Sequence, residues 1–155
     1  MASEYGGIRF MQEKDLDQVA QMEQEIFSIP WSRDGFQSSL QSKDTIYMIT
    51  YVRQGETDRV IAYCGLLRSF EEADITNVAV QEAFRGQGVA RRMISALMEE
   101  GRKQGIERFT LEVRTGNKAA IHLYETLGFH GVGVRKRFYE KPTEDALIMW
   151  TSDVI

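Results

Sequence analysis

The sequence has little cysteine and no long apolar run. Its only cysteine among 155 residues is Cys64, which excludes an internal disulfide and a cysteine-only metal cluster and favours a reducing compartment. No segment approaches the ~18–20 apolar residues that span a bilayer, and residues 1–9 show no signal-peptide pattern. We therefore expect a cytoplasmic protein with no membrane partner.

Positive charge is also in short supply. The 19 Lys and Arg residues against 23 Asp and Glu give a net charge of −4, which disfavours nucleic acid as the main partner. Apolar residues make up 43% and charged residues 27%, as in an ordinary globular protein. Since no repeat or Gly/Ser-rich linker divides the chain, we expect one domain over residues 1–155, as a monomer or weak dimer.

The hydrophobic pattern predicts a mixed α/β fold with an antiparallel front half and a βαβ-like back half. Asp15, Ser32 and Asn117 stand where helices should begin and are good N-cap residues. Helices are predicted near 16–27, 32–41, 89–103 and 117–127, and strands near 6–11, 46–52, 60–67, 74–80, 108–114, 129–139 and 145–151.

A glycine-rich segment, 85–90, joins a predicted strand to a predicted helix. Its glycines let backbone N–H groups approach an anion, and the helix start adds unpaired donors. The segment therefore predicts a phosphate or pyrophosphate site, to which Arg85 and Arg91 or Arg92 can add charge. It lacks the Lys-Ser/Thr of a P-loop and the third glycine of a dinucleotide site. A glycine-rich turn without a ligand is the alternative.

The chain resembles a known family over nearly its whole length, most strongly from residue 75 to residue 129. Asn77-Val78-Ala79-Val80 followed by Arg85-x-x-Gly88-x-Ala90 is similar to the acyl-CoA signature of the GNAT N-acetyltransferases. Leu123-Tyr124-Glu125-x-Leu127-Gly128-Phe129 matches the second half of the family pattern. The combination most resembles the RimI-type ribosomal-protein alanine N-acetyltransferases. The resemblance implies a single GNAT-like α/β domain, with a mixed, mostly antiparallel sheet, four flanking helices and a V-shaped splay between the strands at 74–80 and 108–114.

The resemblance also implies that acetyl-CoA lies in this V as co-substrate and that no metal is needed. The backbone of the 78–80 strand would pair with the pantetheine amides, and the glycine-rich segment would hold the pyrophosphate. Asn117, beyond capping its helix, would contact the cofactor. The implied cofactor-binding residues are Val78, Ala79, Val80, Arg85, Gly86, Gln87, Gly88, Val89, Ala90, Arg91, Asn117 and Tyr124.

Glu112 is the candidate general base. Strand alternation places Leu111 and Val113 on one side and Glu112 on the other. A carboxylate beside the proposed cleft can take a proton from an amine. A solvated strand residue, or an ion pair with Arg114, is the alternative.

Tyr124 is the candidate general acid by resemblance, in which role it protonates the departing thiolate. The alternative is a core tyrosine, because Ile121, Tyr124 and Leu127 share a helical stripe. Cys64 is interpreted as a buried core thiol, and His122 and His130 as surface residues.

The acceptor side is predicted from an apolar loop and a tyrosine. The resemblance places Ile29 and Trp31 of the 27–31 segment on the peptide side, opposite Tyr139, while Trp31 could instead be a core anchor. We expect direct transfer, in a ternary complex, to a protein N-terminus, namely the N-terminal alanine of a small-subunit ribosomal protein. The Phe138-Tyr139 pair departs from the usual Tyr-Tyr. A lysine or small-amine acetyltransferase and a non-catalytic acyl-CoA-binding module are the alternatives.

Overall fold

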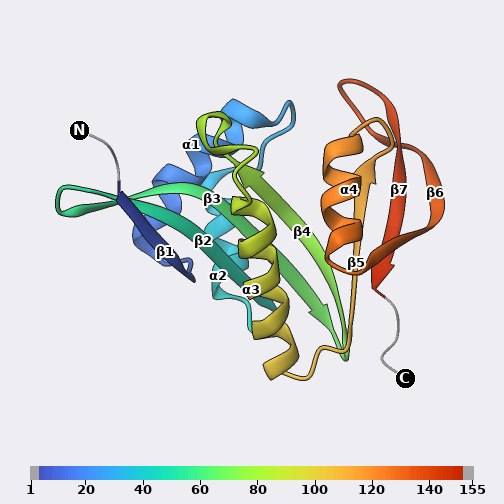
Figure 1. Ribbon diagram of the computed structural model, residues 1–155, viewed down its shortest axis with the longest axis horizontal. Coiled ribbons are helices and arrows are strands. Elements are labelled where there is room, and N and C mark those ends of the chain that lie inside the picture. The colour runs from blue at the N-terminus through green and yellow to red at the C-terminus, as the bar shows by residue number, and fades with distance from the viewer. Residues whose placement is uncertain (1–3, 152–155) are drawn as a thin grey trace.

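The computed structural model describes residues 4–151 (Figure 1). Residues 1–3 and 152–155, the ends of the predicted 1–155 domain, lie outside the described residues. The order of helices and strands is the predicted one, with two short 3-10 turns at Glu13–Asp15 and Glu82–Phe84. The elements are β1 (Glu4–Phe10), α1 (Leu16–Ile26), α2 (Arg33–Gln41), β2 (Thr45–Gln54), β3 (Thr57–Ser69), β4 (Glu72–Val80), α3 (Val89–Lys103), β5 (Arg108–Arg114), α4 (Lys118–Thr126), β6 (Phe129–Tyr139) and β7 (Glu144–Thr151).

The described strands form one seven-stranded sheet in the order β1-β2-β3-β4-β5-β7-β6. Neighbouring strands are antiparallel except β4 and β5, which are parallel. A parallel pair needs a crossover connection, and α3 provides it. The predicted mixed, mostly antiparallel sheet with four helices is confirmed.

Helices cover both faces of the β1–β4 part of the sheet. Figure 1 shows α3 on one face and α1 with α2 on the other, while α4 packs beside β6. Each face has its own apolar cluster. Met93 and Phe109 belong to the α3 cluster, and Leu16, Phe36 and Tyr63 belong to the α1–α2 cluster.

Two of the three predicted helix caps are confirmed. Ser32 Oγ accepts from Gly35 N at 3.0 Å, and Asn117 Oδ1 accepts from Ala120 N at 3.2 Å. The predicted cap by Asp15 is wrong, although Asp15 does precede α1. The 3-10 turn before the helix directs its carboxylate backward, where it accepts from Gln12 N at 2.8 Å.

The central strands are buried as predicted. Residues 46–50 of β2 are covered on both faces. Cys64 in β3 has no exposed surface, and burial raises the pKa of its thiol, so the prediction of a core thiol is confirmed. His122 and His130 are exposed, also as predicted.

Gly65 of β3 is required by a close approach to β2. It lies opposite Tyr47, and a Cβ at this position would be 2.2 Å from Tyr47 Cε1. Tyr47 cannot easily move, because it is 4% exposed and its hydroxyl donates to Asn77 at 3.2 Å. We predict that Gly65→Ala lowers the free energy of unfolding by about 1–3 kcal/mol, as measured by urea denaturation.

Gly133→Ala is the matched control. Gly133 lies in β6, is exposed, and a Cβ there would meet no heavy atom within 4 Å. Its free energy of unfolding should change by less than about 1 kcal/mol. Equal urea midpoints for the two variants would contradict the steric argument.

Candidate active site

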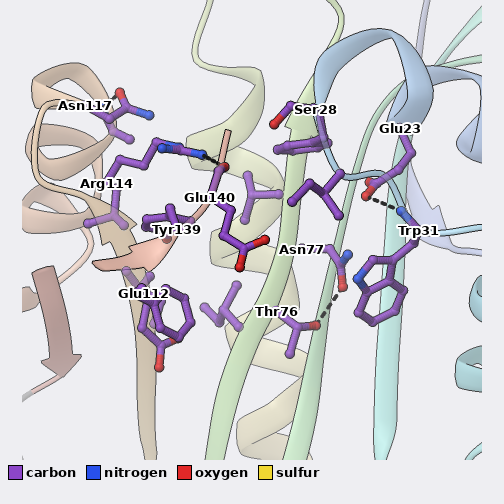
Figure 2. Close-up of a pocket in the computed structure, with 18 of the residues that line it drawn as sticks. Glu23, Ser28, Trp31, Thr76, Asn77, Glu112, Arg114, Asn117, Tyr139 and Glu140 are labelled. Carbon is purple, nitrogen blue, oxygen red and sulfur yellow. Dashed lines mark hydrogen bonds between the residues drawn. The ribbon is translucent and has the colours of Figure 1, made fainter. Parts of the chain in front are cut away.

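The sheet opens between β4 and β5. These strands pair only where residues 72–74 meet residues 108–110, and beyond that point they diverge (Figure 1). The predicted V-shaped splay is therefore confirmed. A cavity of about 460 Å³ occupies it (Figure 2). The cavity lining includes seven predicted site residues: Ile29, Trp31, Val78, Glu112, Asn117, Tyr124 and Tyr139.

A β-bulge at Thr76 orients the β4 side of the cavity. The pairing of β4 with β3 moves from Ile75–Leu66 to Asn77–Gly65, which leaves Thr76 as the extra residue. A bulge places two consecutive side chains on the same side of a sheet. Each side chain after the bulge therefore points to the opposite face of the sheet from the one it would occupy if the alternation were unbroken.

The effect of the bulge is visible in the packing. Val78 and Val80 pack against the α3 cluster, whereas Ala79 is buried in the α1–α2 cluster. Two hydrogen bonds fix the Asn77 side chain: its Oδ1 accepts from Tyr47 Oη at 3.2 Å and from Thr76 Oγ1 at 2.7 Å. Residues 75–78 of β4 thus border the cavity, and residues 79–80 continue the same strand beyond it.

Glu112 lines the cavity from β5. Leu111 and Val113 on either side are buried, while the Glu112 side chain is 21% exposed. Its Oε1 lies 3.6 Å from Nη1 of Arg135 in β6. The alternative of an ion pair with Arg114 is wrong, because Arg114 pairs with Glu144 of the neighbouring strand β7 at 3.2 Å.

Tyr124 and Asn117 face the cavity from α4. Tyr124 is 8% exposed and its ring meets Phe129 edge-on, with the centroids 5.9 Å apart. Burial, and then the nearby Tyr139, raise the pKa of Tyr124, so its hydroxyl keeps its proton at neutral pH. Tyr124 is both a core residue and a cavity residue. Asn117 caps α4 and borders the cavity, so its two interpretations are compatible as well.

Arg114 holds the β6–β7 turn against the cavity. Its guanidinium donates to Glu140 O at 3.1 Å and to Pro142 O at 2.9 Å, and lies 4.5 Å from the Tyr139 ring centroid (Figure 2). Burial and then the charge of Glu112 raise the pKa of Tyr139 to about 12. Tyr139 is therefore a neutral, firmly placed wall of the site.

Glu23 fixes the opposite wall. It is 4% exposed, and its carboxyl group accepts from Tyr63 Oη and, at 3.0 Å, from Trp31 N. Trp31 packs on Phe36 with ring centroids 5.4 Å apart and also borders the cavity, so it is both an anchor and a lining residue. Ile29 beside it is 53% exposed.

The role of Glu23 is missing from the predicted site. The sequence indicates the burial of Glu23 only weakly. Val19, Met22, Glu23 and Ile26 fall on one stripe of α1, so an acid occupies the apolar face of this helix. Its two partners come from β3 and from the segment after α1. Only the tertiary fold brings them together.

The glycine-rich segment has the backbone of an anion site. Gly86 and Gly88 have φ of +75° and +78°, a region that favours glycine. The first hydrogen bond of α3 runs from Arg92 N to Gly88 O at 3.1 Å. The amides of 89–91 therefore have no partner within the helix. Added bulk would crowd the loop, because a Cβ on Gly88 would lie 2.9 Å from Arg92 Nη1.

The arginines near this segment mostly support the loop itself. Arg85 Nε donates to Val80 O at 3.0 Å, and its side chain borders a second cavity of about 560 Å³. Arg92 Nη1 donates to Gln87 O at 3.2 Å, while Arg91 is exposed. Arg85 and Arg92 are thus bonded to main-chain carbonyls, whereas the Arg91 side chain lies at the surface.

Two further predictions concern a metal site and a membrane-spanning helix. No group of three or more His, Cys, Asp or Glu side chains within residues 4–151 is placed to hold a metal ion. None of the described helices has the length and apolar character needed to cross a membrane. A metal-free reaction remains a prediction.

Comparison with known proteins agrees with this geometry. Residues 16–129 match the acetyltransferase (GNAT) family model. The [ribosomal protein bS18]-alanine N-acetyltransferase of Escherichia coli strain K12 is 32% identical over 146 residues, which are 92% of this chain and 94% of the relative. The predicted resemblance to the ribosomal-protein alanine N-acetyltransferases is confirmed.

Solved structures show the same fold. The ribosomal-protein-S18-alanine N-acetyltransferase from Escherichia coli has a TM-score of 0.82 at 31% identity, over 96% of this chain and 94% of that one. Arabidopsis thaliana NAA60 in complex with acetyl-CoA shares the fold, with a TM-score of 0.81 at 19% identity over 92% and 96% of the two chains. On the strength of the family match and the near full-length relative, this chain belongs to the GNAT family and is an N-acetyltransferase.

Proposed function

We propose that the protein transfers an acetyl group from acetyl-CoA to the N-terminal α-amine of a protein, by direct transfer in a ternary complex in the cytoplasm. The observation that carries this proposal is the single cavity in which Glu112, Tyr124 and the 27–31 segment meet. The name of the Escherichia coli relative supports an acceptor that begins with alanine, in ribosomal protein bS18.

The chain has features that fit acetyl-CoA. The positive φ angles of Gly86 and Gly88 and the unpaired amides of 89–91 suit a pyrophosphate group. The 78–80 backbone offers pairing groups for an extended pantetheine arm. When bound, acetyl-CoA supplies the acetyl group as a reactive thioester. Asn117 and Tyr124 border the same space from α4.

Glu112 acts as the general base. A protein α-amine has a pKa near 7.7–8.0, so only about a tenth of it is neutral at pH 7. Glu112 takes the ammonium proton directly or through a water, a type of assistance worth ~10²–10⁴-fold in rate. Its contact with Arg135 is long, and the Arg135 side chain is 56% exposed. Such a pair is weak, so the carboxylate is readily released.

Tyr124 acts as the general acid. The amine nitrogen bonds to the acetyl carbon as the carbon–sulfur bond breaks, and the phenol gives its proton to the departing thiolate. Tyr124 is protonated at the start of the cycle because burial raises its pKa. Its proton is then restored from solvent, while the proton held by Glu112 is released.

The acceptor enters between two walls of different origin. Figure 2 shows Trp31 on one side of the cavity and Tyr139 and Glu140 on the other. Ile29, two residues before Trp31, also lines the cavity. The apolar surfaces of Ile29, Trp31 and Tyr139 suit a short, extended N-terminal segment whose amine points toward Glu112.

A peptide panel tests the proposed acceptor. We predict acetylation of a peptide with the N-terminal sequence of bS18 from the same organism, at the α-amine only, measured by thiol release and mass spectrometry. The same peptide with a blocked α-amine should not react, and neither should a lysine-only peptide. Modified lysine would instead establish a lysine acetyltransferase. Tight acetyl-CoA binding without turnover of any peptide would favour a binding module.

Substitutions at the two catalytic positions test the mechanism. We predict that Glu112→Gln lowers kcat/KM for the peptide by ~10²–10⁴-fold, because the amide cannot accept the proton. Tyr124→Phe should lower kcat without weakening acetyl-CoA binding, measured by calorimetry. Glu125→Gln, at an exposed site next to Tyr124, is the control. Wild-type rates in Glu112→Gln would remove Glu112 from the role of base.

The Glu23 contacts give a separate prediction for the acceptor wall. Glu23→Gln replaces one acceptor oxygen with an NH₂ group, so Tyr63 Oη and Trp31 N cannot both keep their present bonds. We predict that KM for the peptide rises about 10-fold, as the loss of about 1.4 kcal/mol would produce, while KM for acetyl-CoA is unchanged.

Glu25→Gln is the matched control, because Glu25 is exposed on the same helix and contacts only Gln21 among the hydrogen bonds between described side chains. Its kinetic constants should equal those of the wild type. An equal rise of both KM values in Glu23→Gln would indicate a disturbance of the whole cavity rather than loss of the acceptor wall alone.

A further inference from the structure

Asp74 lies at the base of the V, in the last paired position of β4. It is level with Thr110 of β5, and beyond this pair the two strands separate. Its Oδ1 is shielded from solvent and finds no hydrogen-bond partner among the described residues. A buried polar oxygen without a partner is costly, so its retention calls for an explanation.

Strand alternation places Asp74 and Glu112 on the same face of the sheet. Asp74 precedes the bulge at Thr76, and Glu112 is two residues beyond Thr110, so their side chains project to one side. The negative charge of Glu112 helps to raise the pKa of Asp74. The charges of Glu112 and Asp74 both help to raise the pKa of Tyr139.

Charged groups from three strands surround this pair. Arg135 of β6 is 3.6 Å from Glu112 and also stabilises the Asp74 carboxylate. Tyr139, also of β6, is neutral because its pKa is raised to about 12. At the start of the paired segment, Arg108 of β5 is already bonded to Glu72 of β4 at 3.4 Å. One exposed arginine therefore faces two carboxyl groups.

Burial raises the pKa of Asp74 to about 6, and the negative charge of Glu112 adds to this, while Arg135 opposes it. When two carboxylates share a site, their protons belong to the pair rather than to either residue. A pair of this kind binds a proton nearer to neutral pH than an isolated carboxylate does, and it attracts a cationic amine.

We infer that Asp74 and Glu112 form a carboxyl pair that holds one proton in the acetyl-transfer step, with Asp74 as the positioning residue that sets the proton affinity of the pair. The inference rests on the proposed role of Glu112 as base. The proton that leaves the acceptor ammonium goes to Glu112, and Asp74 makes that transfer more favourable. The proton returns to solvent after the amide has formed, so no other reactant is needed.

The pH dependence of kcat/KM tests this role. In the wild type, activity should fall on the acid side as the doubly ionised pair takes up its first proton, because that proton occupies the base. Asp74→Asn should move the acid limb to lower pH by about one unit, because one negative charge is removed, and should lower the rate at neutral pH several-fold. Asp74→Glu, which keeps the charge, should retain the wild-type limb. Asp34→Asn, at an exposed position in α2, is the control and should leave the profile unchanged.

A measurement without turnover separates this inference from the proposed function. Carbon-13 NMR of labelled carboxyl groups in the unliganded protein should show Asp74 titrating near pH 6, and at lower pH in Glu112→Gln. Titration of Asp74 at its ordinary value in both proteins would overturn the pairing. Coupled titration together with a fully active Glu112→Gln would overturn only the catalytic assignment of Glu112.

Thermal unfolding shows whether the variant folds and gives a further check. The raised pKa of Asp74 means that the native protein binds its proton more tightly than the unfolded chain, so stability is lost as pH rises from about 4 to about 6. Asp74→Asn should therefore unfold at a higher temperature than wild type at pH 8, with little difference at pH 4. If Asp74→Asn instead unfolds at a lower temperature than wild type at pH 8, the buried, ionised Asp74 carboxylate does not destabilise the native protein and this argument fails.

Discussion

Three residue pairs join β4 to β5, and the site depends on the fact that the pairing stops there. The crossover through α3 makes these strands parallel neighbours, yet beyond Asp74 and Thr110 they diverge (Figure 1). The edge of β4 that faces β5 therefore has backbone groups with no ladder partner in that strand. Such groups need another partner. The proposed pairing of an extended pantetheine arm with residues 78–80 would satisfy this need.

The two walls of the V are braced by different interactions. On one side, Glu23 joins the end of α1 to Trp31 and to Tyr63 in the core. Across the cavity, Arg114 gathers the β6–β7 turn by main-chain hydrogen bonds and by its contact with the Tyr139 ring. Both braces are charged or polar side chains that bond to backbone groups. They fix loop positions without filling the space between the walls.

Local sequence patterns predict most of the fold because alternation and capping are local properties. Ser32 and Asn117 cap the helices that follow them, as their residue types indicate. Asp15 does not, because a 3-10 turn redirects its carboxylate. Partner choice is harder to predict: Glu112 pairs with Arg135 rather than with Arg114, since the strand order places β7 beside β5 and β6 beyond β7. Glu23 and Asp74 were missed for the same reason, because their surroundings come from distant segments.

Glu23 and Asp74 show why burial alone does not identify a functional carboxyl group. Glu23 is almost fully buried, but it accepts hydrogen bonds from two partners, so its burial is compensated and its role is to position the acceptor wall. Asp74 is less buried, yet its shielded oxygen has no partner among the described residues and Glu112 acts on it. A shielded carboxyl oxygen without a hydrogen-bond donor favours the protonated form, whereas a carboxylate that accepts two hydrogen bonds holds its donors in place. The difference in hydrogen bonding, rather than in depth, is the reason we infer that Asp74 tunes the proton affinity of Glu112 and that Glu23 supports the architecture of the site.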